Sequence, residues 1–189
     1  TGESETFTIT VNPTAQVESI VDLVYCDEDI TNVIEFTTTN TDGITVFNWT
    51  NDNTNTGLAA SGTGDIASFA VTAGTVSEMS TIVVTPTYTN NGVSCDGPSE
   101  TFTITVNPTA QVDSVVDQVL CNGESTDAIE FTTTNTDGTT VFNWTNDNTT
   151  IGLPIAGGSG DIGSFVVLNN TSVSQTATFV VTPTYTNNG

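Results

Sequence analysis

The stretch TFTITVNPTAQV occurs twice in this chain, at Thr6–Val17 and again, letter for letter, at Thr101–Val112. Its first half alternates threonine with Phe, Ile and Val, which is the period-two pattern of a β-strand with one buried face. The Asn-Pro pair that follows ends such a strand, because proline has no amide hydrogen to donate to a ladder. A copied strand with its copied stop signal predicts tandem copies of one β unit.

The likeness extends over the rest of the chain. Three further strings recur: FTTTNTDG at Phe36–Gly43 and Phe131–Gly138, VFNWTNDNT at Val46–Thr54 and Val141–Thr149, and VTPTYTNNG at Val84–Gly92 and Val181–Gly189. The second copy carries one-residue insertions before Asp161 and before Pro183. Roughly two-thirds of the aligned positions are identical, which indicates recent duplication of a module.

The Asn-Pro junctions suggest where one repeat ends and the next begins. We expect residues 1–12 to be the last strand of a preceding repeat and residues 13–107 to be a complete β-sandwich repeat. Residues 108–189 would be a second repeat, truncated before its last strand and its second cysteine.

The complete repeat is expected to be all-β. Its apolar alternation and turn signals predict strands near Gln16–Val24, Asn32–Thr39, Thr45–Thr50, Ala67–Thr72, Thr81–Thr89 and Glu100–Val106. No segment keeps a helical period. About seven short strands in roughly 95 residues are typical of an immunoglobulin-like sandwich. Alternation places Phe47 and Trp49 on one face of a central strand, with Phe142 and Trp144 as their counterparts, and we expect these four in the core.

All charged side chains in this sequence are negative. The chain has no Lys, Arg or His, and its 22 Asp and Glu residues give a net charge of −22. No salt bridge between side chains can form, and nothing can displace counterions from phosphates, so nucleic-acid binding is excluded. Anionic membranes are disfavoured for the same reason. We also expect no direct membrane insertion, since no apolar run could span a bilayer.

The missing residue types also exclude most catalysis. Without histidine or lysine, no Ser-His-Asp set, Cys-His set or P-loop can form. A pair of glycosidase carboxylates is compatible with the sequence, but it would be copied in both repeats. We therefore expect no enzyme activity.

The chain has three cysteines, and Cys26 matches Cys121 in the repeat alignment. We expect Cys26 to pair with Cys95, and Cys121 with a cysteine beyond Gly189. A bridge of this span is worth roughly 2–4 kcal/mol and requires an oxidising compartment, which predicts an extracellular protein. Free buried thiols are the alternative.

Oxygen-rich loops suggest calcium as the one cofactor to consider. Asp52 and Asp65, with their copies Asp147 and Asp161, are weak candidate ligands, since carboxylates and amides suit a hard cation. EF-hand spacing fails, and Asx residues in turns also cap local backbone groups. We expect no other cofactor.

TFTITVNPTAQV, FNWTNDN, SGTGDIASF and VTPTYTNNGVSC together resemble the PKD-like repeats of giant surface proteins of Bacteroidota, most of all SprB-type gliding-motility adhesins. The resemblance covers essentially the whole chain, although the usual WDFGDG string is absent. It implies tandem immunoglobulin-like, PKD-like sandwiches, type IX secretion and display on the cell surface, associated with the outer membrane through the parent protein. It also implies that the gliding and secretion machinery acts on that parent.

These observations lead to one main hypothesis and two alternatives. The main hypothesis is a non-catalytic stalk segment of a large secreted adhesin for gliding motility and surface attachment, with neighbouring repeats as its partners. A polysaccharide-binding module is the first alternative, with Tyr88 and Tyr185 as candidate contacts. An ancillary domain of a secreted hydrolase is the second.

Overall fold

The computed structural model describes residues 2–187 and is almost entirely β. It divides into two compact units: unit 1 comprises residues 1–72 and 78–106, and unit 2 comprises residues 73–77 and 107–189. The strands are β1 (Leu23–Cys26), β2 (Ile44–Asn51), β3 (Ser61–Thr63), β4 (Glu78–Asn90), β5 (Val93–Asp96), β6 (Glu100–Asn107), β7 (Thr139–Asn146), β8 (Gly157–Ser159) and β9 (Phe179–Thr186). Two 3₁₀ turns, Thr54–Thr56 and Thr149–Ile151, complete the list.

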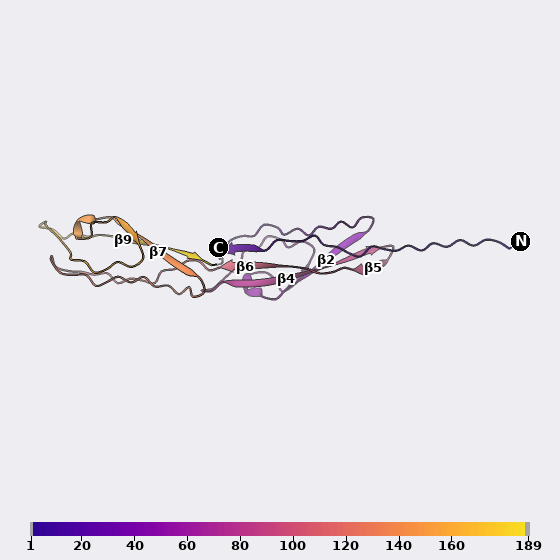
Figure 1. The fold of residues 1–189 in the computed structure, drawn as a ribbon, viewed down its shortest axis with the longest axis horizontal. Helices are drawn as coiled ribbons and strands as arrows, with labels where there is room; N and C mark the ends of the chain where they lie inside the picture. The colour runs from indigo at the N-terminus through magenta and orange to yellow at the C-terminus, as the bar shows by residue number, and fades with distance from the viewer. Residues whose placement is uncertain (1, 188–189) are drawn as a thin grey trace. The chain divides into compact units, whose positions relative to one another are not determined.

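Unit 1 is organised around β4, its longest strand (Figure 1). The hydrogen-bonded order is β1-β6-β4-β2-β3, and β5 also pairs with β4. Alternate residues of β4 are buried, including Ile82, Val84 and Tyr88. This alternation gives the sheet one core face, as the period of two requires.

A second layer packs on the core face of the unit 1 sheet. Residues 28–36 and 65–72 run antiparallel, with isolated bridges Ile30↔Ala70 and Ile34↔Ile66. Phe36 from this layer meets Phe47 of β2 with ring centroids 5.7 Å apart. The core of unit 1 therefore lies between a continuous sheet and a loosely paired second layer.

Strand β6 closes unit 1 and carries the second copy of TFTITV. It pairs antiparallel with β4, from Glu78↔Val106 to Val84↔Glu100. Phe102, Ile104 and Val106 are 1%, 0% and 0% exposed, so the whole apolar face of the strand is buried.

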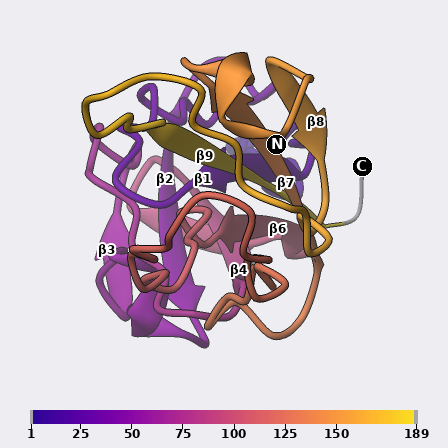
Figure 2. The same ribbon diagram turned by 90° about the vertical axis from the view of Figure 1, so that its left-hand side faces the viewer.

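Unit 2 repeats the central part of this sheet. Strands pair in the order β8-β7-β9, as Figure 2 shows for β7 and β8. The β7–β9 register matches that of β2–β4, since Trp144 faces Val181 as Trp49 faces Val84. Strand β9 begins at Phe179, the counterpart of Ile82, whereas β4 begins four residues earlier in the repeat at Glu78.

Three of the six strands predicted from the sequence are present in the structure, and three are not. The strands predicted near Thr45–Thr50, Thr81–Thr89 and Glu100–Val106 are confirmed as β2, β4 and β6. The predicted strand Gln16–Val24 is wrong over most of its length, because only residues 23–26 form a ladder. The predictions Asn32–Thr39 and Ala67–Thr72 are also wrong as strands, since each contributes only isolated bridges.

Side-chain hydrogen bonds explain the first of these differences. The amide of Gln16 donates to Asn40 Oδ1 at 2.8 Å, and Asn40 Nδ2 donates to the Thr14 carbonyl at 3.1 Å. The side chain of Asn40 thus occupies the Gln16 amide and the Thr14 carbonyl, two backbone groups that a strand ladder would have used. No helix in residues 2–187 is long and apolar enough to span a membrane.

Candidate functional site

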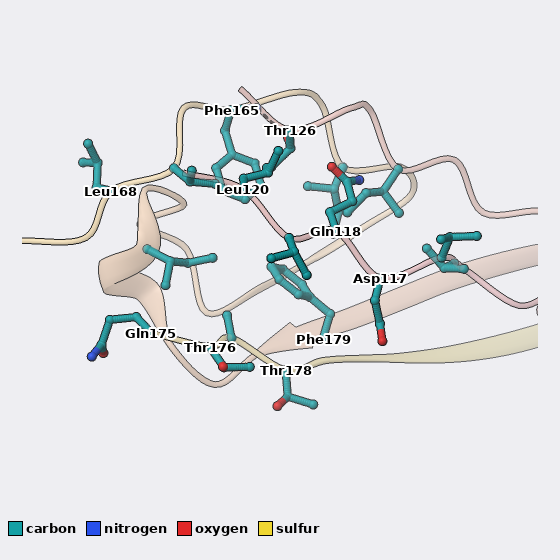
Figure 3. A pocket seen from close by; sticks show the side chains of 18 of the residues that line it. Asp117, Gln118, Leu120, Thr126, Phe165, Leu168, Gln175, Thr176, Thr178 and Phe179 are labelled. Atoms are coloured by element: carbon teal, nitrogen blue, oxygen red, sulfur yellow. Dashed lines mark hydrogen bonds between the residues drawn. The ribbon is translucent and has the colours of Figure 1, made fainter. Parts of the chain in front are cut away.

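Unit 2 has a groove of about 750 Å³ beside β9, lined by both apolar and polar side chains. We call it the groove. Figure 3 shows Leu120, Phe165 and Phe179 on three separate segments around it, while Thr178 points the other way. Val116 and Val181 extend the apolar lining. Asp117 is the one ionisable side chain among its described lining residues.

The groove lies where unit 1 carries β6. In unit 1, Ile82 and Val84 are covered by β6 and are fully buried. Their counterparts Phe179 and Val181 are only half-buried. Within residues 2–187, β9 pairs with β7 alone, so its other edge faces the groove without a strand partner.

The core of unit 2 is correspondingly small. Its buried cluster consists of Phe131, Trp144 and Ile162. Partly buried hydrophobic residues pack against this cluster: Val112, Ile129, Phe142, Leu153, Phe165, Phe179 and Val181. Of the four aromatic residues expected in the core, Phe47, Trp49 and Trp144 are buried and Phe142 is half-buried.

The four candidate calcium ligands each bind a backbone amide. Asp52 Oδ1 accepts from the Thr81 amide at 2.6 Å, and Asp147 Oδ1 accepts from Thr178 at the same distance. Asp65 and Asp161 accept from the amides of Phe36 and Phe131, both at 2.9 Å.

The structure does not bring these carboxylates together. No group of three or more His, Cys, Asp or Glu side chains among the described residues could hold a metal ion. The hydrogen bond from the Thr81 amide lowers the pKa of Asp52, which keeps the carboxylate charged and so strengthens this local bond.

The predicted disulfide is not present, and this prediction is corrected. Cys26, Cys95 and Cys121 are all free thiols. Cys95 lies on β5 rather than in a loop, and its Cα partner is Tyr88, close to the end of β4. Cys26 and Cys121 are exposed, and Cys95 is half-buried.

The position of Cys26 explains why it does not reach Cys95. The turn after Cys26 is hydrogen-bonded to Val71, and the amide of the next residue, Thr72, donates to the Thr56 carbonyl. The Thr56 hydroxyl in turn donates to Ser80 Oγ at 3.2 Å. Ser80 and Tyr88 are separated by about 26 Å at roughly 3.3 Å per strand residue. A disulfide needs Cα atoms within about 7 Å, so the two thiols lie near opposite ends of β4 and cannot be bridged.

The tyrosines proposed as sugar contacts are not open aromatic platforms. Tyr88 is buried, and its hydroxyl donates to the Thr41 carbonyl at 2.8 Å. Tyr185 is half-buried and donates to Asp137 Oδ1 at 2.6 Å. Burial and the hydrogen bond to Asp137 raise the pKa of Tyr185. Both hydroxyls are therefore engaged within their own unit.

Sequence reasoning missed the short strands β3 and β8 and the backbone roles of the aspartates. The signal was present in the SGTGD and GGSGD strings, where glycine precedes an aspartate in both copies. Trp49 Nε1 donates to the Gly64 carbonyl at 3.1 Å, and Trp144 Nε1 donates to Gly160 at 3.0 Å. These strings hold the tryptophans in place.

Fold and groove together define an all-β protein built from two related units, and within residues 2–187 strand β9 of the second unit has no strand partner on its groove side. No family model, curated protein or solved structure matches the chain.

Proposed function

We propose that this chain is a non-catalytic structural segment, a stalk piece, of a large secreted cell-surface adhesin. Each unit is then an immunoglobulin-like, PKD-like sandwich, as the sequence resemblance implies. The parent protein would leave the cell by type IX secretion and serve attachment and gliding motility. Its repeats contact neighbouring repeats of the same polypeptide.

One observation carries the proposal: the residues that are identical between the two copies maintain the scaffold. The Asp52 and Asp147 bonds, the Asp65 and Asp161 bonds, and the two tryptophan bonds recur in both units at nearly equal distances. Repetition of internal contacts is what a modular spacer requires.

Dimensions and charge also support a spacer. Strand β4 has 13 residues and so extends over about 43 Å at roughly 3.3 Å per residue, which gives each unit a length of a few nanometres. The net charge of −22 makes neighbouring repeats repel one another, which favours an extended and soluble array.

Deleting one repeat from the parent gene tests the proposal directly. Electron microscopy of the surface filaments should show them shortened by about 4 nm per deleted repeat, while the adhesive ligand is still bound. Replacing the deleted repeat with an unrelated sandwich domain of equal length should restore the filament length. Loss of ligand binding or of a hydrolytic activity on deletion, unrepaired by that replacement, would contradict a spacer role.

Polysaccharide binding is the second candidate, and the groove of unit 2, with its polar and apolar lining, is the observation that favours testing it. A glycan array with the 189-residue chain distinguishes the two, because a binding module should retain defined sugars and a spacer should not. The burial of Tyr88 and the half-burial of Tyr185 weigh against this candidate.

A further inference from the structure

The N-terminal segment TFTITV at residues 6–11, which we call the arm, is an apolar strand sequence without a place in a sheet. Phe7, Ile9 and Val11 are 83%, 80% and 85% exposed. Residues 2–22 form no strand in the structure, and the arm runs extended at the N-terminal end of unit 1 (Figure 1). Three large hydrophobic side chains exposed on one face of an extended segment are typical of an interaction site.

The same six-residue sequence occurs again in this chain at residues 101–106. There it is part of β6 and pairs with β4, and Phe102, Ile104 and Val106 are almost completely buried. The arm therefore has a known preferred partner: the edge of a strand with the sequence and setting of β4.

Unit 2 presents that edge in open form. Strand β9 repeats the β4 string VTPTYT and has β7 on one side only among the described residues. The groove lies on the other side and is lined by Phe179 and Val181. In unit 1 their counterparts, Ile82 and Val84, lie beside the paired strand β6. An uncovered strand edge beside such a groove is a template for strand addition.

We propose that a second copy of this chain inserts its arm into the groove as a new strand beside β9. The β4–β6 register, with Ile82↔Phe102 and Ser80↔Ile104, sets the register of the complex. Phe7 of one copy then lies opposite Phe179 of the other, and Ile9 lies opposite Ala177. The ladder between β9 and the arm then continues to residue 175, the counterpart of Glu78, where the β4–β6 ladder ends. The proposal concerns the 189-residue chain by itself; within the longer array of the proposed function, a following TFTITV segment of the same polypeptide would take this place beside β9.

A polar contact in unit 1 predicts one in the complex. The Thr103 amide of β6 donates to Asp22 Oδ1 at 2.7 Å. Thr8 and Asp117 are the counterparts of these two residues, and Asp117 lines the groove. The Thr8 amide of the arm therefore donates to Asp117. Residues 118–121 then form a strand on the outer side of the arm, as β1 does beside β6.

The arrangement has one arm and one groove per copy. Such a contact is heterologous, so it propagates head to tail into an open series of dimers, trimers and longer chains. Each copy carries a net charge of −22, and this repulsion opposes association. Added salt should strengthen the assembly, because it screens that repulsion without weakening an apolar, backbone-paired contact.

Sedimentation velocity of the full 189-residue chain tests the proposal, at low and at about 0.5 M NaCl, where screening is nearly complete. We expect a concentration-dependent series of oligomers that grows with salt. Ile9→Asp removes the central apolar contact from an exposed position, so the fold stays intact, and should weaken association at least about tenfold. Thr10→Asp is the matched control, with the same added charge one residue along on the outward face, and should change association less than about twofold.

A synthetic peptide of residues 4–12 provides a second readout. In excess it should occupy the groove and convert the oligomers to monomers, whereas the same peptide with Asp at the Ile9 position should not. A chain that stays monomeric at millimolar concentration in 0.5 M NaCl would overturn the proposal. So would oligomers that Ile9→Asp and Thr10→Asp affect equally, since a different surface would then hold them together.

Discussion

The six-membered ring of Trp49 lies against Gly62 of β3, so closely that a Cβ added to Gly62 would stand 2.2 Å from Trp49 Cζ2. Gly158 and Trp144 repeat the contact in unit 2, with the corresponding distance at 2.7 Å. The short strands β3 and β8 therefore keep glycine because an indole occupies the space above it.

Gly62→Ala should destabilise unit 1 by about 1–3 kcal/mol, because the buried indole must move to admit one methyl group. Urea denaturation followed by the fluorescence of Trp49, in a Trp144→Phe background, measures the change. Gly2→Ala is the control within unit 1, since no heavy atom lies within 4 Å of a Cβ there. It should stay within about 0.5 kcal/mol of the parent.

Asn51 should be equally sensitive. Its side chain is buried, donates to the Leu58 carbonyl at 3.0 Å and accepts from the Asn53 amide at 3.1 Å. Asn51→Ala leaves those backbone groups without partners, at a cost of about 1–3 kcal/mol. Asn48→Ala, on the exposed face of the same strand, should change the free energy of unfolding by less than about 0.5 kcal/mol. Equal losses in the two variants would contradict the buried network.

The two units should unfold separately, with unit 2 first. Burial of Phe102, Ile104 and Val106 contributes on the order of 5 kcal/mol to unit 1, and the counterpart edge of unit 2 is open. Trp49→Phe and Trp144→Phe variants leave one reporter in each unit, and Trp144 should report the transition at lower urea. The peptide of residues 4–12 should raise that transition and leave the Trp49 transition unchanged, because a ligand stabilises the unit that binds it.

Acid should remove the contribution of Asp52. Its folded-state pKa lies below the ordinary value of 3.8, so the charged hydrogen bond is fully present above that value and is lost as pH falls through the folded pKa. The difference in urea midpoint between the parent and Asp52→Asn should be present at pH 7 and shrink toward zero below pH 3.8. A difference that stays constant with pH would show that the charge of Asp52 contributes nothing.

Thiol chemistry should follow the corrected cysteine assignment. All three cysteines should react with a thiol reagent in the native chain without prior reduction, the exposed Cys26 and Cys121 faster than the half-buried Cys95. Mass spectrometry after alkylation counts the modified sites. A Cys26–Cys95 pair that resists alkylation until reduced would require a fold different from the one described.

The sequence predicts the all-β class and the three strands richest in alternating residues, because β2, β4 and β6 each bury a complete apolar face. It does not predict the second layer, where Ile34 and Ile66 pair through a single bridge. Alternation in such a segment signals one buried face but carries no information on whether a neighbouring strand supplies hydrogen bonds.

The site was harder to predict than the fold. Cys26 and Cys95 lie in the same repeat of the sequence, but spacing alone does not reveal which end of β4 each one reaches. The aspartates illustrate the same limit, since Asp65 can cap the Phe36 amide only because residues 34 and 66 are paired. Both depend on contacts between distant segments, which local pattern does not encode.

Each of the four candidate calcium ligands accepts a hydrogen bond from a backbone amide, in a chain that has no cationic side chain to pair with a carboxylate. The same composition has a consequence for proteolysis. Proteases of the trypsin type hold a basic side chain in an acidic specificity pocket, and this polypeptide offers them no lysine or arginine, folded or unfolded. Digestion falls instead to proteases of other specificities, and for those that cut after aromatic residues we expect the bond after the exposed Phe7 to be cleaved first.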